Sequence, residues 1–403
     1  MPESSLSERF LPYGKQSIND DDIAAVVDVL RGDWLTTGPA VDAFETAFAQ
    51  AAGAPYAIAC ANGTAALHLA LLALGVGPGD RVVVPSITFV ATANTVRHVG
   101  AEVIFADVDP DTGLMTPSTL KEALSRAPGP VRAVMPVHLA GQPADMDGIA
   151  EIAADVGAEL VEDACHALGS TDDRGGLVGA CSTSSAAAFS LHPVKTIAAG
   201  EGGVVTTRDL RVASQLRQLR NHGMVRERFS NESAAHAADG QANPWYYEMP
   251  APGFNYRLTD IQAALATSQL NRLGDFVRRR QELVSLYDKA LSSLAPVLRP
   301  TTRVPGRPGW HLYAVLIDFE AIGLDRAQLM AGLRARKIGS QVHYIPVHKQ
   351  PYYADRYDTP ELPGAKDWYR RTLSLPLFPS MADQDINRVA EALRQVIGGA
   401  GIG

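Results

Sequence analysis

The stretch Ser190-Leu-His-Pro-Val-Lys195-Thr-Ile-Ala-Ala-Gly-Glu-Gly-Gly203 places a lysine in a glycine-rich turn. An apolar run over 186–189 leads into the turn, and a β-branched run over 204–207 follows it. Such runs predict buried strands on both sides of Lys195. Burial lowers the pKa of an ammonium group and makes the nucleophilic amine available, which suits Schiff-base chemistry. The alternative is a lysine at the end of a strand whose amine extends into water. Taken alone, this stretch of sequence fits both interpretations equally well.

The composition describes an ordinary globular protein and excludes several classes. The chain has 403 residues, of which 46% are hydrophobic and 20% are charged, and its formal net charge is −8. This length predicts roughly two to three domains with a large core. The negative charge and the lack of a basic cluster argue against nucleic acid as a partner. Three cysteines without a CxxC spacing indicate reduced thiols, and we expect no disulfide framework and no metal site.

The sequence also predicts where the protein is found. Its first residues show no basic segment followed by an apolar one, so we expect no export signal. The longest apolar helical run, 65–76, carries His68 and is too short to cross a bilayer. We therefore expect a cytoplasmic protein without a membrane partner.

Short apolar strands alternate with helical segments through the first half of the chain. After two helices, one capped by Asn19 and one over 41–48, we expect strands at 56–60, 81–85, 102–106, 132–137 and 158–162, and helices at 63–75, 89–99, 117–125 and 145–156. This alternation predicts an α/β fold, in which a mostly parallel sheet carries helices on both faces.

The pattern changes further along the chain and suggests three parts. We expect an N-terminal arm over 1–16, a large α/β domain over 17–257 and a smaller α+β domain over 258–403. The polar segment 225–245 is predicted to be a long loop without a pattern of its own, as functional or mobile loops often are. The smaller domain is expected to contain a helical region over 258–291, a strand near 311–317, a helix over 326–336, a strand near 340–344 and a helix over 383–397.

Polar residues follow the predicted strands, and open parallel sheets bind ligands at these carboxyl ends. After the first strand, Asn62-Gly63-Thr64-Ala65 opens a helix, whose free amides and dipole suit a phosphate group. The hydroxyl of Ser190, five residues before the lysine, can reach the same phosphate. After the second strand, Phe89 can place a ring over this region, although a core position explains it as well.

An acidic residue and a histidine follow the fifth strand. Asp163 can stabilise a protonated ring nitrogen, and His166 can reach a neighbouring ring oxygen. Capping of the following turn is the structural alternative for the aspartate. An anion cradle, an aromatic ring, an acid and a lysine are together what pyridoxal 5′-phosphate (PLP) requires.

Several segments resemble the DegT/DnrJ/StrS family, PLP-dependent nucleotide-sugar aminotransferases of fold type I. They are Asn62-Gly-Thr-Ala-Ala, Glu162-Asp-Ala-Cys-His-Ala, Phe189-Ser-Leu-His-Pro-Val-Lys195, Gly200-Glu-Gly-Gly and Gly253-Phe-Asn-Tyr-Arg-Leu-Thr-Asp260. The resemblance implies that Lys195 forms the Schiff base and that Asp163 pairs with the pyridine nitrogen. It implies a homodimer with shared active sites, and cofactor binding by Gly63, Thr64, Ala65, Phe89, Asp163, His166, Ser190, Lys195 and the neighbouring subunit's Asn255.

Three further segments resemble one branch of this family, the C4 aminotransferases of pseudaminic acid biosynthesis. They are Asn221-His-Gly-Met224, Pro244-Trp-Tyr-Tyr-Glu248 and His343-Tyr-Ile-Pro-Val-His-Lys-Gln-Pro-Tyr-Tyr353. This likeness implies transfer of an amino group from L-glutamate to a UDP-linked 4-keto-6-deoxy N-acetyl hexosamine. It implies that the sugar nucleotide is bound by Tyr13, Trp34, Leu35, Thr36, His343 and Tyr344.

Other functions stay open at this point. A GDP- or dTDP-linked keto sugar, or amination at C3, would use the same machinery. A non-catalytic PLP-binding sensor would usually carry a DNA-binding module, and the chain has no basic helical extension. A dehydratase of the same family would carry histidine at the position of Lys195.

Overall fold

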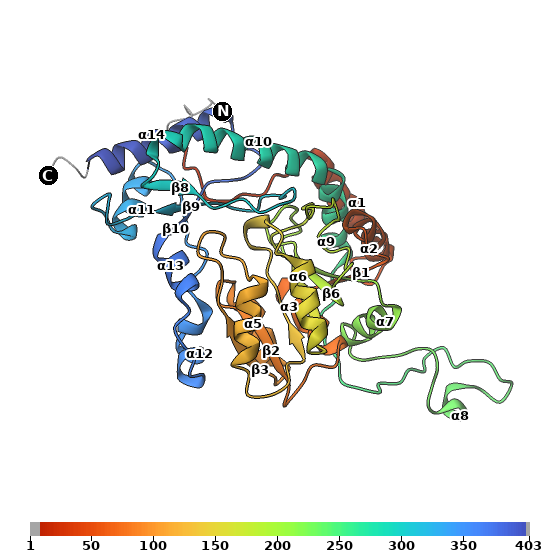
Figure 1. The fold of residues 1–403 in the computed structure, drawn as a ribbon. Coiled ribbons are helices and arrows are strands. Elements are labelled where there is room, and N and C mark those ends of the chain that lie inside the picture. Colours follow the sequence, from red (N-terminus) through yellow and green to blue (C-terminus); the bar gives the residue numbers. More distant parts are fainter. Residues whose placement is uncertain (1–8, 400–403) are drawn as a thin grey trace.

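A seven-stranded sheet forms the centre of the computed structural model, which describes residues 9–399 (Figure 1). Its strand order is β1-β7-β6-β5-β4-β2-β3. The strands are β1 (Tyr56–Cys60), β2 (Arg81–Pro85), β3 (Glu102–Ala106), β4 (Ala133–Val134), β5 (Glu159–Asp163), β6 (Ala186–Ser190) and β7 (Gly203–Thr207). Neighbouring strands from β3 to β6 are parallel, whereas β7 is antiparallel to both β6 and β1. The predicted mostly parallel sheet is therefore confirmed.

Helices cover both faces of this sheet, because alternate strand residues point to opposite sides. In β2, Val82 and Val84 belong to the core beneath α3, α4 and α7, and Val83 belongs to the core beneath α5 and α6. The helices of this part are α1 (Asp20–Arg31), α2 (Pro39–Ala52), α3 (Gly63–Ala73), α4 (Val90–His98), α5 (Pro117–Ser125), α6 (Met146–Asp155) and α7 (Leu210–Leu219), with the 3₁₀ turn η1 (Leu139–Gly141). As expected, Asn19 caps α1.

The region 258–291, expected to be one helical stretch, consists of two helices. They are α9 (Asp260–Asn271) and α10 (Leu273–Leu291), which are separated at Arg272. Helix α9 packs against α1 and α2, and Leu258, Ala263 and Ala266 share a buried cluster with Phe44 of α2. The domain boundaries expected at 16/17 and 257/258 stay predictions.

A second, smaller sheet lies in the C-terminal part, as an α+β arrangement requires. It has the order β10-β9-β8 and is antiparallel throughout. Its strands are β8 (Leu298–Pro300), β9 (Tyr313–Ile317) and β10 (Thr372–Leu375); the helices here are α11 (Arg326–Ala335), α12 (Pro351–Arg356), α13 (Pro363–Arg371) and α14 (Asp383–Gly399), with the 3₁₀ turns η2 (Ser292–Leu294) and η3 (Val347–Lys349). The N-terminal arm joins this part: Leu11 is fully buried and pairs with Ile338.

The strand expected near 340–344 is wrong. This segment finds its backbone partners on different elements instead of along one strand. Gly339 donates to Leu11, Gln341 exchanges hydrogen bonds with Ser374, and Val347 donates to Ser86 at the end of β2. The segment therefore crosses from the smaller sheet to the larger one.

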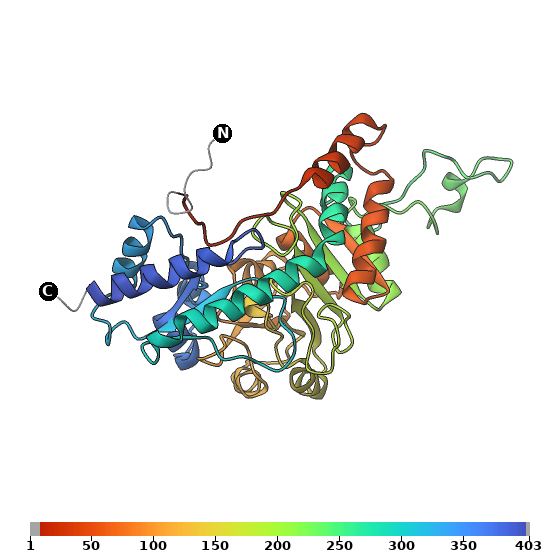
Figure 2. The same cartoon turned by 90° about the horizontal axis from the view of Figure 1, so that it is seen from above.

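The polar segment near 225–248 forms an arm that projects from the body (Figures 1 and 2). The long loop expected over 225–245 is confirmed as mostly irregular, although it contains the short helix α8 (Glu232–Ala235) and its ends pair through Val225 and Glu248. The Glu248 carboxylate accepts the amides of Ser230 and Asn231 and the hydroxyl of Tyr246. In residues 9–399, no helix is long and apolar enough to cross a bilayer.

Candidate active site

A cavity of about 880 Å³ lies at the carboxyl ends of the parallel strands. It is lined by helix starts α3 and α4, the lysine turn, the N-terminal arm and the segment 341–345. The residues expected at the site that line it are Tyr13, Gly63, Thr64, Ala65, Phe89, Asp163, His166, Ser190, Lys195, His343 and Tyr344. Positions far apart in the sequence thus meet at the place expected for an open α/β sheet.

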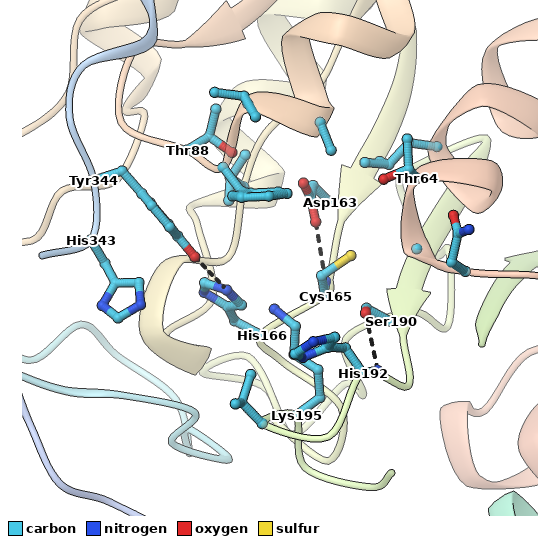
Figure 3. A pocket seen from close by; sticks show the side chains of 18 of the residues that line it. Thr64, Thr88, Asp163, Cys165, His166, Ser190, His192, Lys195, His343 and Tyr344 are labelled. Carbon is cyan, nitrogen blue, oxygen red and sulfur yellow. Dashed lines mark hydrogen bonds between the residues drawn. The ribbon is translucent and has the colours of Figure 1, made fainter. Parts of the chain in front are cut away.

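Lys195 extends its side chain into this cavity (Figure 3). The turn that carries it begins as β6 ends, and the Lys195 amide donates to the His192 carbonyl at 2.8 Å. Among the described residues, its amine has no hydrogen bond or ion pair. Burial lowers the pKa of the Lys195 ammonium, although the nearby Cys165 and Asp163 partly oppose this effect. A half-buried amine without a partner is available for covalent chemistry, which favours the first interpretation of this lysine.

Asp163 ends β5 with only 6% of its surface exposed. Its Oδ2 accepts a hydrogen bond from the Thr92 hydroxyl at 2.8 Å, and its Oδ1 accepts one from the Cys165 amide at 3.2 Å. Donors of the protein therefore hold both carboxyl oxygens in place. Asp163 and Glu201 are the acidic side chains among the described residues that line the cavity.

His166 is a neutral ring whose tautomer is set by its neighbours. Burial, with the nearby Lys195 and His343, lowers the pKa of His166 well below its usual value. Its Nδ1 accepts the Ala140 amide at 3.3 Å, so the neutral ring carries its proton on Nε2. That Nε2 lies 3.2 Å from the Tyr344 hydroxyl (Figure 3). The tyrosine oxygen accepts this hydrogen, which leaves its own O–H as a donor toward the cavity.

The start of α3 leaves two amides for a ligand. The side chain of Asn62 caps the helix by accepting the Ala65 amide at 2.8 Å. The amides of Gly63 and Thr64 have no partner among the described residues, and they point out of the positive end of the helix. A Cβ on Gly63 would lie 2.8 Å from the Ser190 Cβ, so only glycine lets helix and lysine turn approach this closely. The result is a cradle for an anion.

We expect Gly63→Ala to weaken PLP binding by about 10-fold, because the new methyl group must displace Ser190 from the cradle. Titration of the apoprotein with PLP, followed by absorbance, measures this. Gly77→Ala is the matched control, since its Cβ would meet nothing closer than the Val99 carbonyl at 4.0 Å. Equal PLP affinity of the Gly63→Ala variant and the wild type would rule out the cradle.

Aromatic side chains line the other side of the cavity. Phe89 is 56% exposed, so the core position considered for it is wrong, and its ring lies 6.0 Å from that of Tyr344. The ring of Tyr13 lies 5.5 Å from that of His343, whose Nδ1 is 2.8 Å from the Ser374 hydroxyl. Burial and the nearby lysine lower the pKa of His343 to about 3.

Four residues expected at the site lie outside the cavity of the single chain. Trp34, Leu35 and Thr36 occupy the loop between α1 and α2; the first two are about half exposed, and the third pairs with Thr259. Asn255 is exposed and pairs with Asn221. These residues are accessible to a second chain.

Sequence reasoning missed several residues of the site. Thr88 and Thr92 flank Phe89 four positions apart, a helical spacing next to a strand end that offered a usable signal. His311 offered none, because tertiary folding brings it to the cavity, where its ring lies 4.3 Å from that of His166. Glu201, Gln341 and the half-buried Tyr256 also line the cavity.

These groups fit PLP. The unpartnered amine suits its aldehyde, the free amides at α3 suit its phosphate, and the Asp163 carboxylate suits its ring nitrogen. The sequence profile of the DegT/DnrJ/EryC1/StrS aminotransferase family matches residues 16–394.

Individual relatives match over nearly their whole length. The spore coat polysaccharide biosynthesis protein SpsC of Bacillus subtilis (strain 168) is 40% identical over 394 residues, which cover 97% of this chain and 98% of SpsC. The structure of Helicobacter pylori PseC, an aminotransferase of pseudaminic acid biosynthesis, has a TM-score of 0.87 at 26% identity and covers 97% and 100% of the two chains. DesI, solved in the presence of its TDP-sugar product, has a TM-score of 0.85 at 30% identity, over 99% and 96%. The chain therefore belongs to the DegT/DnrJ/EryC1/StrS family and is a PLP-dependent sugar aminotransferase of fold type I.

Proposed function

We propose that the enzyme transfers the amino group of L-glutamate to the C4 keto group of a UDP-linked 4-keto-6-deoxy N-acetyl hexosamine. The product would be UDP-4-amino-4,6-dideoxy-N-acetyl-β-L-altrosamine, a precursor of pseudaminic acid. The main observation in favour of a sugar acceptor is one wall of the cavity, which is neutral and rich in hydrogen-bonding groups. This wall is formed by Tyr13, Gln341, His343 and Tyr344. Neutral donors and aromatic rings suit sugar hydroxyls. The pseudaminic acid branch is supported by the similarity to PseC, an aminotransferase of pseudaminic acid biosynthesis, along 97% of the chain. The choice of UDP and C4 follows from the resemblance of the three segments to that branch.

The protein's own groups have separate tasks in this reaction. Bound PLP supplies the aldehyde that carries the amino group and the ring that withdraws electrons. The Nζ of Lys195, whose pKa is lowered by burial, would hold the aldehyde of PLP. Once the amine of the substrate has displaced it, the free Nζ would serve as a general base and acid for the proton transfer. The negative charge of Asp163 holds a proton on the ring nitrogen.

The remaining groups orient the bound molecules. Gly63 and Thr64 hold the phosphate with their amides, and Phe89 covers one face of the ring. Nε2 of His166 donates to the Tyr344 oxygen, and the Tyr344 hydroxyl in turn supplies a donor for the ring oxygen or the sugar. The N-terminal arm contributes Tyr13 to the wall of the cavity.

The charges of the cavity argue for a second subunit. Lys195 is the one lysine or arginine among the described residues that line it. Glutamate carries two carboxylates and a nucleotide sugar carries a diphosphate, so further cations must reach them. We infer that the protein is a homodimer in which each chain completes the site of the other. The surface around the partner's Asn255 would approach the phosphate group of PLP. Full activity of a species shown by light scattering to be monomeric would contradict this.

A product assay tests the proposal. The enzyme is given PLP, L-glutamate and, in separate reactions, UDP-, GDP- and dTDP-linked 4-keto-6-deoxy sugars, and mass spectrometry follows the exchange of keto for amino. Conversion of the UDP-linked N-acetyl hexosamine alone is expected. Use of [¹⁵N]glutamate, with nitrogen found in the sugar, identifies the donor.

A dTDP-linked keto sugar is the second candidate, because DesI, solved in the presence of its TDP-sugar product, is 30% identical to this chain. Conversion of that substrate instead would keep the transfer chemistry and replace the acceptor. If glutamate leaves the absorbance of bound PLP unchanged, the aminotransferase mechanism itself is contradicted, and a sensor becomes the better explanation.

A further inference from the structure

The carboxylate of Asp163 is held by a short chain of hydroxyl groups that the reaction itself does not use. Thr88 lies directly before Phe89, and Thr92 lies in the first turn of α4. The Thr88 and Thr92 hydroxyl oxygens are 2.7 Å apart, and the Thr92 oxygen lies 2.8 Å from Asp163 Oδ2. We propose that Thr92 is a positioning residue that orients Asp163 toward the ring nitrogen of PLP, and that Thr88 in turn orients Thr92. This inference rests on the role proposed for Asp163.

Hydrogen counting gives the chain a direction. The Thr92 hydroxyl has one hydrogen and two acceptors in reach, Asp163 Oδ2 at 2.8 Å and the Phe89 carbonyl at 3.2 Å. The carboxylate is the closer acceptor and the charged one, so it takes the hydrogen. The Thr88 hydroxyl must then donate to Thr92. The order is therefore Thr88 to Thr92 to Asp163.

Burial makes this arrangement specific. Thr88 is 1% exposed, Thr92 is not exposed, and Asp163 is 6% exposed, so water does not replace the hydroxyl donors. The second carboxylate oxygen is held by the Cys165 amide. Each carboxylate oxygen thus accepts one hydrogen bond, from Thr92 on α4 or from Cys165 in the loop after β5. Together the two hydrogen bonds fix the plane of the carboxylate. Its remaining lone pairs are left for a ligand in the cavity that it lines.

The test compares threonine variants of α4 loaded with PLP that carries ¹⁵N in the ring. Thr92→Val removes the hydroxyl but keeps the branched shape, and Thr92→Ser keeps the hydroxyl. Thr95→Val is the matched control, because Thr95 is equally buried on the same helix and, within residues 9–399, its hydroxyl bonds only to the Thr92 carbonyl. Two quantities are measured: the ring-nitrogen chemical shift by NMR and the dissociation constant of PLP.

We expect Thr92→Val to weaken PLP binding on the order of 10-fold, as loss of a charge-assisted hydrogen bond implies. Its ring-nitrogen signal should move toward the unprotonated value. Thr92→Ser should restore both quantities, and Thr95→Val should leave both unchanged. If Thr92→Val does not fold, Thr88→Val carries the test, with a smaller shift in the same direction expected.

Asp163→Asn separates the two possible failures. A shifted signal in Asp163→Asn, together with unchanged signals in the Thr92→Val and Thr88→Val variants, would overturn the positioning role and keep the role of the aspartate. An unchanged signal in Asp163→Asn would overturn both. A loss of PLP affinity in Thr95→Val as large as that in Thr92→Val would show that helix packing is responsible, which also overturns the inference.

Discussion

Replacement of Lys195 by alanine is expected to lower the rate of amino transfer by about 10⁴-fold or more. The variant would lose both the amine proposed to bind the aldehyde of PLP and the group proposed to move the proton. Proton transfer alone contributes about 10²–10⁴-fold. No other lysine or arginine among the described residues lines the cavity to replace it. The measurement is the initial rate of conversion of the keto sugar, with glutamate in excess.

A lysine far from the cavity provides the control for this substitution. Lys366 lies on α13 with its side chain 71% exposed and paired with Glu361. Lys366→Ala should transfer amino groups at the wild-type rate, because surface substitutions of this kind rarely change stability by more than about 0.5 kcal/mol. A Lys195→Ala variant that turns over as fast as Lys366→Ala would remove the lysine from the mechanism.

Asp163→Asn is expected to lower kcat by about 100-fold or more. The amide keeps the size of the carboxylate and an oxygen for the Thr92 hydroxyl, but it loses the negative charge that stabilises a protonated ring nitrogen. Removal of one preorganised electrostatic partner in an active site typically costs about 10²–10³-fold in kcat. Steady-state kinetics with glutamate and the keto sugar measure the effect, and KM should change less than kcat.

Asp275→Asn is the control for the lost charge, because this side chain is 67% exposed on α10. It should leave kcat unchanged. If Asp163→Asn lowered only the thermal stability and left kcat intact, the aspartate would be a structural residue of β5.

Much of the fold could be predicted from the sequence because local signals agreed with the tertiary structure. The strands β1, β2 and β3 are short apolar runs that alternate with helices along the chain. The length of each run and the change to a helical pattern after it identified these strands. The glycines at positions 63 and 203 were visible in the sequence, and the structure explains why they are there. A Cβ on Gly203, for example, would lie 2.2 Å from the Asn62 carbonyl oxygen. The glycine-rich segments that pointed to the site in the sequence are therefore also the segments that pack most closely in the structure.

The parts that could not be predicted depend on distant segments. The stretch near 340–344 looked like a strand, but its hydrogen bonds go to the N-terminal arm and to β10. His311 reaches His166 only after the smaller sheet has packed against the larger one. The arm near 225–248 owes its shape to Glu248, whose partners lie up to eighteen residues away. The places of Trp34 and Asn255 in a site depend on a second chain and stay proposals.

Reductive trapping of the cofactor shows whether Lys195 is the residue that holds PLP. The purified enzyme is incubated with PLP and reduced with borohydride, which fixes the cofactor to its lysine, and digested peptides are sequenced by mass spectrometry. We expect a single modified peptide that contains Lys195, and the same peptide without modification when glutamate has been added first. Modification at another lysine, or reduction that fixes no cofactor at all, would contradict this role of Lys195.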